Sequence, residues 1–189
     1  SKILSKYRLK KNNYFLVSIH REENVDNSKN FKSLMETINA IYNKYKIPIV
    51  ISTHPRTRAK LVKGNYKFNK SIIFAKPFGF HDYNKLQINA KCVISDSGTI
   101  TEESSIFDIP AVMIRQAHER PEGMEEGILI MSGIDKINTC ESIKVVVTQK
   151  SKKRTIKIVD DYDVKNVSKK VIRIIFSYTD FVNRNVWKK

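Results

Sequence analysis

The residues best suited to hold an anion lie between positions 92 and 123. A short apolar run at 92–95, typical of a buried strand, leads into D-S-G-T at 96–99 and T-E-E at 101–103. These turn residues and early acids are typical of a helix start with N-cap candidates. A strand that turns through glycine into a helix presents backbone N–H groups and the positive end of the helix dipole, which suits a phosphate or diphosphate. An ordinary strand–helix turn has the same composition, so both interpretations stay open here.

Polar clusters follow five of the apolar runs of the chain. They are H-R at 20–21, T-H-P-R-T-R at 53–58, P-F-G-F-H-D-Y at 77–83, D-S-G at 96–98, and Arg115 with H-E-R-P-E-G at 118–123. Apolar runs that alternate with helical segments imply βαβ crossovers and a parallel sheet covered on both sides. In such a sheet ligands bind beyond the carboxyl ends of the strands. Because all five clusters fall at that edge, we interpret them as one site.

The elements that position these clusters follow from hydrophobic spacing. Strands are predicted at 14–19, 49–52, 71–75, 92–95, 111–114 and 128–131. Helices are predicted from about 31 to just before Pro48, and at 57–62, 81–90, 100–107, 140–148 and 163–184, with polar loops at 20–27 and 115–122. The predicted fold class is α/β, a Rossmann-like parallel sheet with helices on both faces.

Composition and charge indicate a globular domain and argue against membrane and nucleic-acid partners. An apolar fraction of 41% supports a packed core, and no apolar run reaches the roughly 20 residues of a membrane span. The net charge of +16 is concentrated in 1–13 and 144–189, away from the clusters and without aromatic interleaving. We therefore expect no membrane and no nucleic acid as partner, with a basic nucleic-acid-binding protein as an alternative. Cys92 and Cys140 lack metal-ligand spacing, which indicates reduced thiols in a cytoplasmic protein.

Four ordered motifs resemble the non-hydrolysing UDP-N-acetylglucosamine 2-epimerase family. They are H-R-E-E-N-V-D-N at 20–27, S-T-H-P-R-T-R at 52–58, S-D-S-G-T-I-T-E-E-S-S at 95–105 and H-E-R-P-E-G at 118–123. Together with the ending N-R-N-V-W-K-K, they are most similar to the branch that makes UDP-N-acetyl-L-fucosamine for bacterial capsules and O-antigens.

The resemblance implies a two-domain GT-B-like fold, of which this chain resembles only the C-terminal half. Residues 1–13 would then be a basic lead-in or linker, and 14–160 the Rossmann-like UDP-binding domain. Residues 161–189 would be a helix that packs on the missing N-terminal domain. The family's catalytic carboxylates belong to that missing domain, so the fragment alone is expected to be inactive.

The resemblance assigns the phosphate and ribose contacts to the second half of the chain. Ser97, Gly98 and Thr99 would contact the phosphates of UDP at the helix start, and Arg120 would hold the diphosphate as a charged donor. An ion pair within its own loop, to Glu119 or Glu122, is the alternative for Arg120. Glu103 would accept hydrogen bonds from the ribose hydroxyls; an early helix acid that interacts only with the dipole is its alternative.

Four further residues receive roles in the same way. His20 would lie beside the β-phosphate and stabilise the departing UDP, and a purely structural histidine is its alternative. Tyr83 would lie near the uracil, or else in the core. Arg21 and His54 match positions that bind a second, regulatory UDP-sugar in some bacterial members. Regulated members have an asparagine-containing sequence where this chain reads H-P-R-T-R.

The implied reaction is C2 inversion of a UDP-N-acetylhexosamine by elimination and re-addition of UDP. It requires no cofactor and no metal, and the G-x-G-x-x-G dinucleotide fingerprint is absent from the sequence. The expected partners are the UDP-sugar and the missing domain, in a full-length homodimer. The nucleotide-sugar-binding domain of a GT-B glycosyltransferase is the alternative function.

Overall fold

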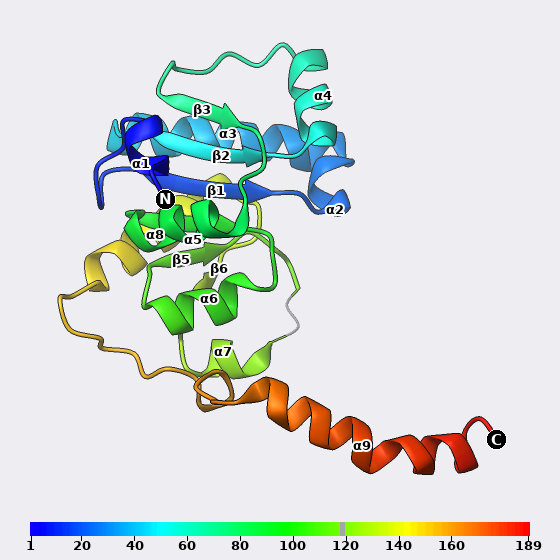
Figure 1. Cartoon of the computed structure of the whole chain (residues 1–189). Helices are drawn as coiled ribbons and strands as arrows, with labels where there is room; N and C mark the ends of the chain where they lie inside the picture. The colour runs from blue at the N-terminus through cyan, green and yellow to red at the C-terminus, as the bar shows by residue number, and fades with distance from the viewer. Residues whose placement is uncertain (118–119) are drawn as a thin grey trace. The chain divides into compact units, whose positions relative to one another are not determined.

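The computed structural model describes residues 1–117 and 120–189. The chain divides into two units, Ser1–Val159 and Asp160–Lys189. The first unit contains the sheet and every candidate site residue (Figure 1).

A parallel sheet of six strands forms the centre of the first unit, in the order β3-β2-β1-β4-β5-β6. The strands are β1 Phe15–Ile19, β2 Ile49–Thr53, β3 Ile72–Ala75, β4 Cys92–Ser95, β5 Ala111–Met113 and β6 Ile130–Met131. Phe15 is in register with Ile49 on one side and with Cys92 on the other. This order is that of a Rossmann-like sheet, and it confirms the predicted fold class.

Helices cover both faces of the sheet. They are α1 Ile3–Lys6, α2 Glu22–Val25, α3 Ser28–Tyr45, α4 Pro55–Lys63, α5 Phe80–Asn89, α6 Ile100–Phe107, α7 Pro121–Glu125 and α8 Lys136–Gln149. Because successive side chains of a strand point to opposite faces, Phe15 and Val17 pack in the core that includes α3 and α8. Leu16 packs in the opposite core with α1, α5 and α6.

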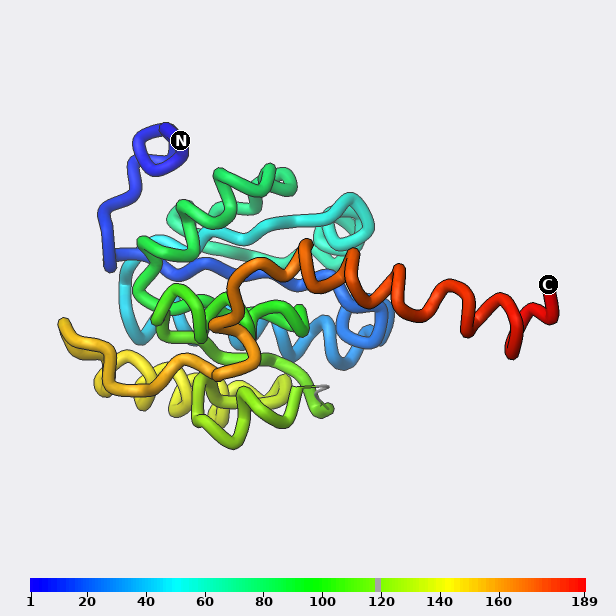
Figure 2. The backbone as a smooth tube through the Cα atoms, turned by 60° about the horizontal axis from the view of Figure 1, so that its bottom comes forward, coloured from blue at the N-terminus to red at the C-terminus, as the bar shows by residue number. Residues whose placement is uncertain are grey.

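The first residues of the chain belong to the second of these cores. Ile3 and Leu9 are buried, and α1 contacts α5. Figure 2 shows the N-terminal coil and the segment that leads from it into the sheet. Tyr14 is buried as well, and its hydroxyl donates a 2.5 Å hydrogen bond to the carbonyl of Leu86 in α5. The basic segment 1–13 therefore contributes apolar side chains to the fold.

Several segments differ from the elements that hydrophobic spacing predicts, α1 among them, since no helix was predicted within residues 1–13. The predicted loop 20–27 contains α2, which depends on contacts from a distant strand end described below. The predicted loop 115–122 runs into α7, a five-residue helix that is too short to show a hydrophobic period. Helix α8 begins four residues before the predicted position 140, because the Asp135 side chain accepts from the N–H of Asn138 and caps the helix.

The second unit contains a short 3-10 helix, Asp160–Tyr162, and α9, Val167–Asn185. Asn166, in a left-handed conformation with φ of 59°, precedes α9, which begins later than the predicted position 163. Its apolar residues recur at three- and four-residue spacing: Val167, Val171, Ile174, Ile175, Tyr178 and Phe181. In the described part of the chain, no helix combines the length and apolarity that crossing a membrane requires.

Candidate functional site

The candidate residues gather where the strand order of the sheet reverses. The chain moves outward in one direction from β1 to β3 and then returns to place β4 on the other side of β1. Helices then leave neighbouring strands toward opposite faces, which opens a crevice at the carboxyl ends of those strands. His20 directly follows β1, and Ser97 and Gly98 follow β4. The two clusters that the sequence placed at one sheet edge therefore flank this switch point.

Asp96 joins the two sides of the switch point. Its carboxylate is fully buried and accepts from the backbone N–H of His20 at 3.1 Å and of Arg21 at 3.0 Å. The side-chain amide of Asn24 donates to it at 3.2 Å, and Nδ1 of His20 lies 3.1 Å from Oδ1. Asn24 also contacts the carbonyl of Ile114, after β5, at 3.4 Å. One carboxylate thus shapes the loop after β1 and fixes the orientation of the imidazole.

The electrostatics of this pair favour a charged imidazole. The hydrogen bond to Asp96 is the largest influence and raises the pKa of His20, against a smaller opposing effect of burial. Burial by itself would raise the pKa of Asp96, but the bonds from His20, Arg21 and Asn24 outweigh it and the pKa is lowered. The carboxylate therefore stays ionised and holds a histidine that protonates more readily than a free one.

Sequence reasoning missed the role of Asp96, since it took the residue for a possible helix cap. Thr99 is the N-cap of α6, and its side chain makes no capping hydrogen bond. The Ser97 hydroxyl pairs with that of Thr99 at 2.9 Å, and the Ser97 N–H donates to the Ser95 hydroxyl at 3.0 Å. Thr99 thus leaves the backbone N–H groups of the helix start to other partners, and such N–H groups suit an anionic ligand.

Arg120 lies against this helix start. A Cβ added at Gly98 would clash with Nη1 of Arg120, so the guanidinium covers the glycine closely. Nε of Arg120 donates to Oε1 of Glu102 in the first turn of α6. Glu102 was not among the partners expected for Arg120, which were Glu119 and Glu122, and Glu119 lies outside the described residues. Glycine at 98 thus allows a cationic side chain to lie directly over the turn.

Glu103 and Tyr83 form the second part of the site. Burial is the main cause that raises the pKa of Glu103, whose Oε2 accepts from Nε2 of Gln87 at 2.5 Å. Tyr83 is partly buried in the core and hydrogen-bonds Ser18 of β1; burial raises its pKa to about 12. The charges of Glu103 and Asp96 also act on Tyr83, which places all three groups in one neighbourhood. Gln87 was not identified from the sequence.

Arg21 and His54 lie further toward β2. The Arg21 backbone N–H contacts Asp96, and its side chain is partly buried. His54 is exposed at the end of β2 and precedes α4. Next to it, Arg56 forms ion pairs with Glu22 at 2.7 Å and Asp26 at 3.4 Å, so it ties α4 to α2. His20 and His54 thus lie at the same edge of the sheet, and His54 is one strand further from the switch point.

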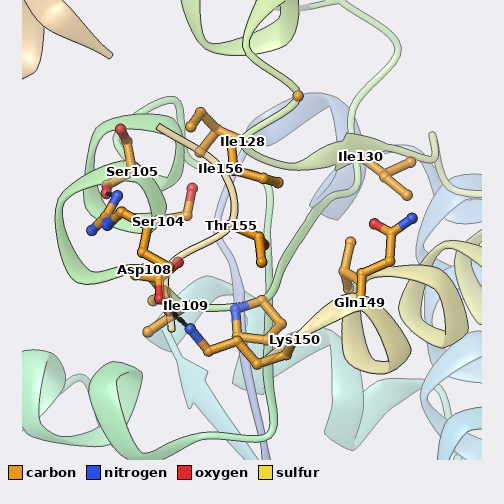
Figure 3. A pocket seen from close by; sticks show the side chains of 14 residues that line it. Ser104, Ser105, Asp108, Ile109, Ile128, Ile130, Gln149, Lys150, Thr155 and Ile156 are labelled. Carbon is orange, nitrogen blue, oxygen red and sulfur yellow. Dashed lines mark hydrogen bonds and ion pairs between the residues drawn. The ribbon is translucent and has the colours of Figure 1, made fainter. Parts of the chain in front are cut away.

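A cavity of about 410 Å³ lies elsewhere, at the amino edge of the sheet (Figure 3). It is lined by the C-terminal ends of α6 and α8, the residues that precede β5 and β6, and segment 154–156. Lys150 and Asp108 pair at its rim. None of the candidate residues lines it, so cavity size does not locate the site in this fold. In the described ranges, no group of three or more His, Cys, Asp or Glu could hold a metal ion.

The match to known proteins agrees with this arrangement. A family model described as UDP-N-acetylglucosamine 2-epimerase matches residues 1–176. The chain belongs to the UDP-N-acetylglucosamine 2-epimerase family. The UDP-N-acetylglucosamine 2-epimerase of Methanocaldococcus jannaschii is 36% identical over 141 residues, which are 72% of this chain and 38% of that protein.

Solved structures of family members have the same fold. The UDP-N-acetylglucosamine 2-epimerase from Rickettsia bellii superposes with a TM-score of 0.87 at 42% identity, covering 100% of this chain and 51% of that one. The M. jannaschii UDP-GlcNAc 2-epimerase in complex with UDP-GlcNAc and UDP gives a TM-score of 0.81 at 30% identity, with 94% and 49% covered. The chain therefore spans about half the length of these relatives, as expected for one half of a GT-B-like fold.

Proposed function

We propose that this chain is the UDP-binding domain of a UDP-N-acetylhexosamine 2-epimerase. One observation carries the proposal: Asp96 holds His20 on one side of the switch point while Arg120 covers Gly98 on the other. An imidazolium, a guanidinium and a helix start would then surround the place where a diphosphate would lie. The family match supports this reading over a glycosyltransferase, and the charge of the chain gives no separate support to nucleic-acid binding.

In the proposed reaction, a base removes the proton at C2 of the sugar. The electron pair of that bond forms a C1–C2 double bond, and the C1–O bond breaks with its electrons going to the β-phosphate of UDP. Re-addition of UDP and return of a proton to the other face of C2 invert the configuration. The base would come from the N-terminal domain that the family resemblance implies.

The residues of this chain would stabilise the leaving group. Negative charge develops on the β-phosphate as the C1–O bond breaks, and fixed positive groups lower the energy of that state more than that of the bound substrate. His20 would carry such a charge because Asp96 raises its pKa. Arg120 and the helix start at Ser97, Gly98 and Thr99 would bind the two phosphates. Glu103 would hold the ribose and Tyr83 would lie near the uracil.

The proposal extends to the whole protein. Residues 1–13 would lead in from an N-terminal domain, 14–160 would bind UDP, and the helix within 161–189 would pack on that first domain through its apolar stripe. The full-length enzyme would be a cytoplasmic homodimer that supplies precursors for bacterial surface polysaccharide, in the UDP-N-acetyl-L-fucosamine branch. The four motifs and the ending N-R-N-V-W-K-K support that branch. Arg21 and His54 match the positions that bind a regulatory UDP-sugar in some bacterial members, while the loop H-P-R-T-R departs from the sequence of those members.

The Arg120→Ala variant tests the binding role. Calorimetry should show weak UDP binding by the 189-residue chain and its loss in the variant, since a hydrogen bond from a charged group contributes about 1.5–3 kcal/mol. Arg173→Ala, which removes one exposed positive charge from α9, is the matched control and should bind UDP like the native chain. Unchanged UDP affinity in Arg120→Ala, or an equal loss in both variants, would contradict the assignment.

A further inference from the structure

Gln87 is a buried residue whose side chain contacts Glu103 of the candidate site. Its side chain is fully buried, and Nε2 donates to Oε2 of Glu103 at 2.5 Å. Its Oε1 has no hydrogen-bond partner among the residues that the structure describes. A buried amide with an unpaired oxygen is less favourable for folding than an apolar side chain of similar size. The presence of glutamine at this position therefore indicates a task other than packing.

The helix that carries Gln87 is fixed to the sheet. Leu86 is fully buried in the core beside Val93 of β4, and Tyr83, one turn before Gln87, hydrogen-bonds Ser18 of β1. The amide of Gln87 is consequently held at a set position relative to β1 and β4. A carboxylate bonded to it is oriented by the sheet itself and not by a mobile loop.

We propose that Gln87 is a positioning residue that orients Glu103 for the two ribose hydroxyls and so makes the site selective for ribonucleotides. An ionised carboxylate offers about four acceptor positions on two oxygens. Gln87 occupies one position on Oε2 and thereby fixes the plane of the carboxylate. Oε1 and the remaining position on Oε2 are left for the hydroxyls. This inference rests on the proposed function, in which Glu103 binds the ribose.

Gln87→Met gives a test because methionine has a similar volume and no donor. UDP and 2′-deoxy-UDP are titrated calorimetrically into the 189-residue chain and the variant. The native chain should prefer UDP by roughly tenfold or more, the factor expected for a hydrogen bond to a charged acceptor. The variant should retain at most about threefold preference, because its carboxylate is free to rotate. Its Tm should be unchanged or higher, because the unpaired oxygen is gone.

Asn89→Ala is the matched control on the same helix. Asn89 is a second buried amide of α5, and its side chain donates to the carbonyl of Lys85 at 2.8 Å. This variant should keep the native preference even if its Tm falls. The inference is overturned if the Gln87→Met variant keeps the native preference for UDP. It is also overturned if the variant loses affinity for both nucleotides equally and its Tm falls. A native chain that binds UDP without preference over 2′-deoxy-UDP overturns it too, while one that binds neither nucleotide contradicts the proposed function itself.

Discussion

Oδ1 of Asp96, after β4, lies 3.1 Å from Nδ1 of His20, after β1. The contact fixes the proton of the imidazole on Nδ1 and leaves Nε2 for a ligand. Because Asp96 also accepts from two backbone N–H groups and from Asn24, its orientation does not depend on the histidine. The carboxylate therefore acts as a fixed support on which the imidazole is placed.

The first prediction concerns the contact between Asp96 and His20. Asp96→Asn should lower the pKa of His20 toward or below its ordinary value, because the negative charge that stabilises the imidazolium is removed. It should also reduce the free energy of unfolding by about 2 kcal/mol or more, since an amide cannot accept all the bonds that this buried carboxylate accepts. NMR titration of the histidine ring protons and urea unfolding measure the two effects. Asp180→Asn, an exposed change in α9, should alter neither; a His20 pKa that does not move in Asp96→Asn contradicts the prediction.

The second prediction is a pH dependence of UDP binding. The protonated form of His20 is the one that attracts the diphosphate, and its pKa is raised in the fold. Affinity for UDP should therefore be full below the pKa of a free histidine and fall as the pH rises through the raised value. Calorimetry between about pH 5.5 and 9 measures this range. UDP itself titrates at about pH 6. His20→Asn keeps that ionisation and those of the other site groups, Glu103 included, so it supplies the baseline. Identical profiles would rule out the imidazolium.

The third prediction concerns Gly98, which the guanidinium of Arg120 covers. Gly98→Ala should weaken UDP binding about tenfold, because the new Cβ displaces the guanidinium. The fold itself should be little affected, since the clash is with the flexible end of a long side chain. Gly79→Ala is the control: it also precedes a helix, and its Cβ would meet nothing within 4 Å. Circular dichroism melts and UDP titrations of both variants check the result, and equal affinities would show that Arg120 does not hold the diphosphate from this position.

The fourth prediction concerns catalysis. The 189-residue chain, incubated with a UDP-N-acetylhexosamine in deuterated water, should introduce no deuterium at C2, because the proposed bases lie in another domain. Proton NMR of the recovered sugar measures the exchange. Deuterium at C2 would place a base within this chain, with Glu22 and Glu23 in α2 as the first candidates and Glu119, outside the described residues, as a third.

The sheet could be predicted from the sequence to within a residue or two at most strand ends. Its strands are continuous apolar runs because both faces are buried, and β4 coincides with the predicted 92–95. Helix α6 likewise coincides with the predicted 100–107. The short helices α2 and α7 could not be predicted, because neither is long enough to show a period and α2 depends on Asp96, more than seventy positions away.

The site was predicted as a set of residues, but its internal contacts were not. The clusters after β1 and β4 follow from the rule that ligands bind at the carboxyl edge. Nothing local in D-S-G-T indicates that its aspartate reaches back to His20, or that Arg120 pairs with Glu102. An acid placed directly after a buried strand at the switch point was the available signal. The sequence around Gln87 contains no such signal, since an isolated glutamine in a helical segment is most often exposed.

Two of the bonds that Asp96 accepts come from the main chain, at His20 and Arg21, and every amino acid except proline supplies that donor. The path of the loop after β1 is therefore encoded at position 96 and at Asn24 rather than in the two side chains that the loop presents. A substitution at position 20 or 21 by any residue except proline would therefore keep these two hydrogen bonds. A new charge or ring introduced there would project from the same backbone positions, so the side chains at this edge of the sheet can be exchanged while the loop keeps its path.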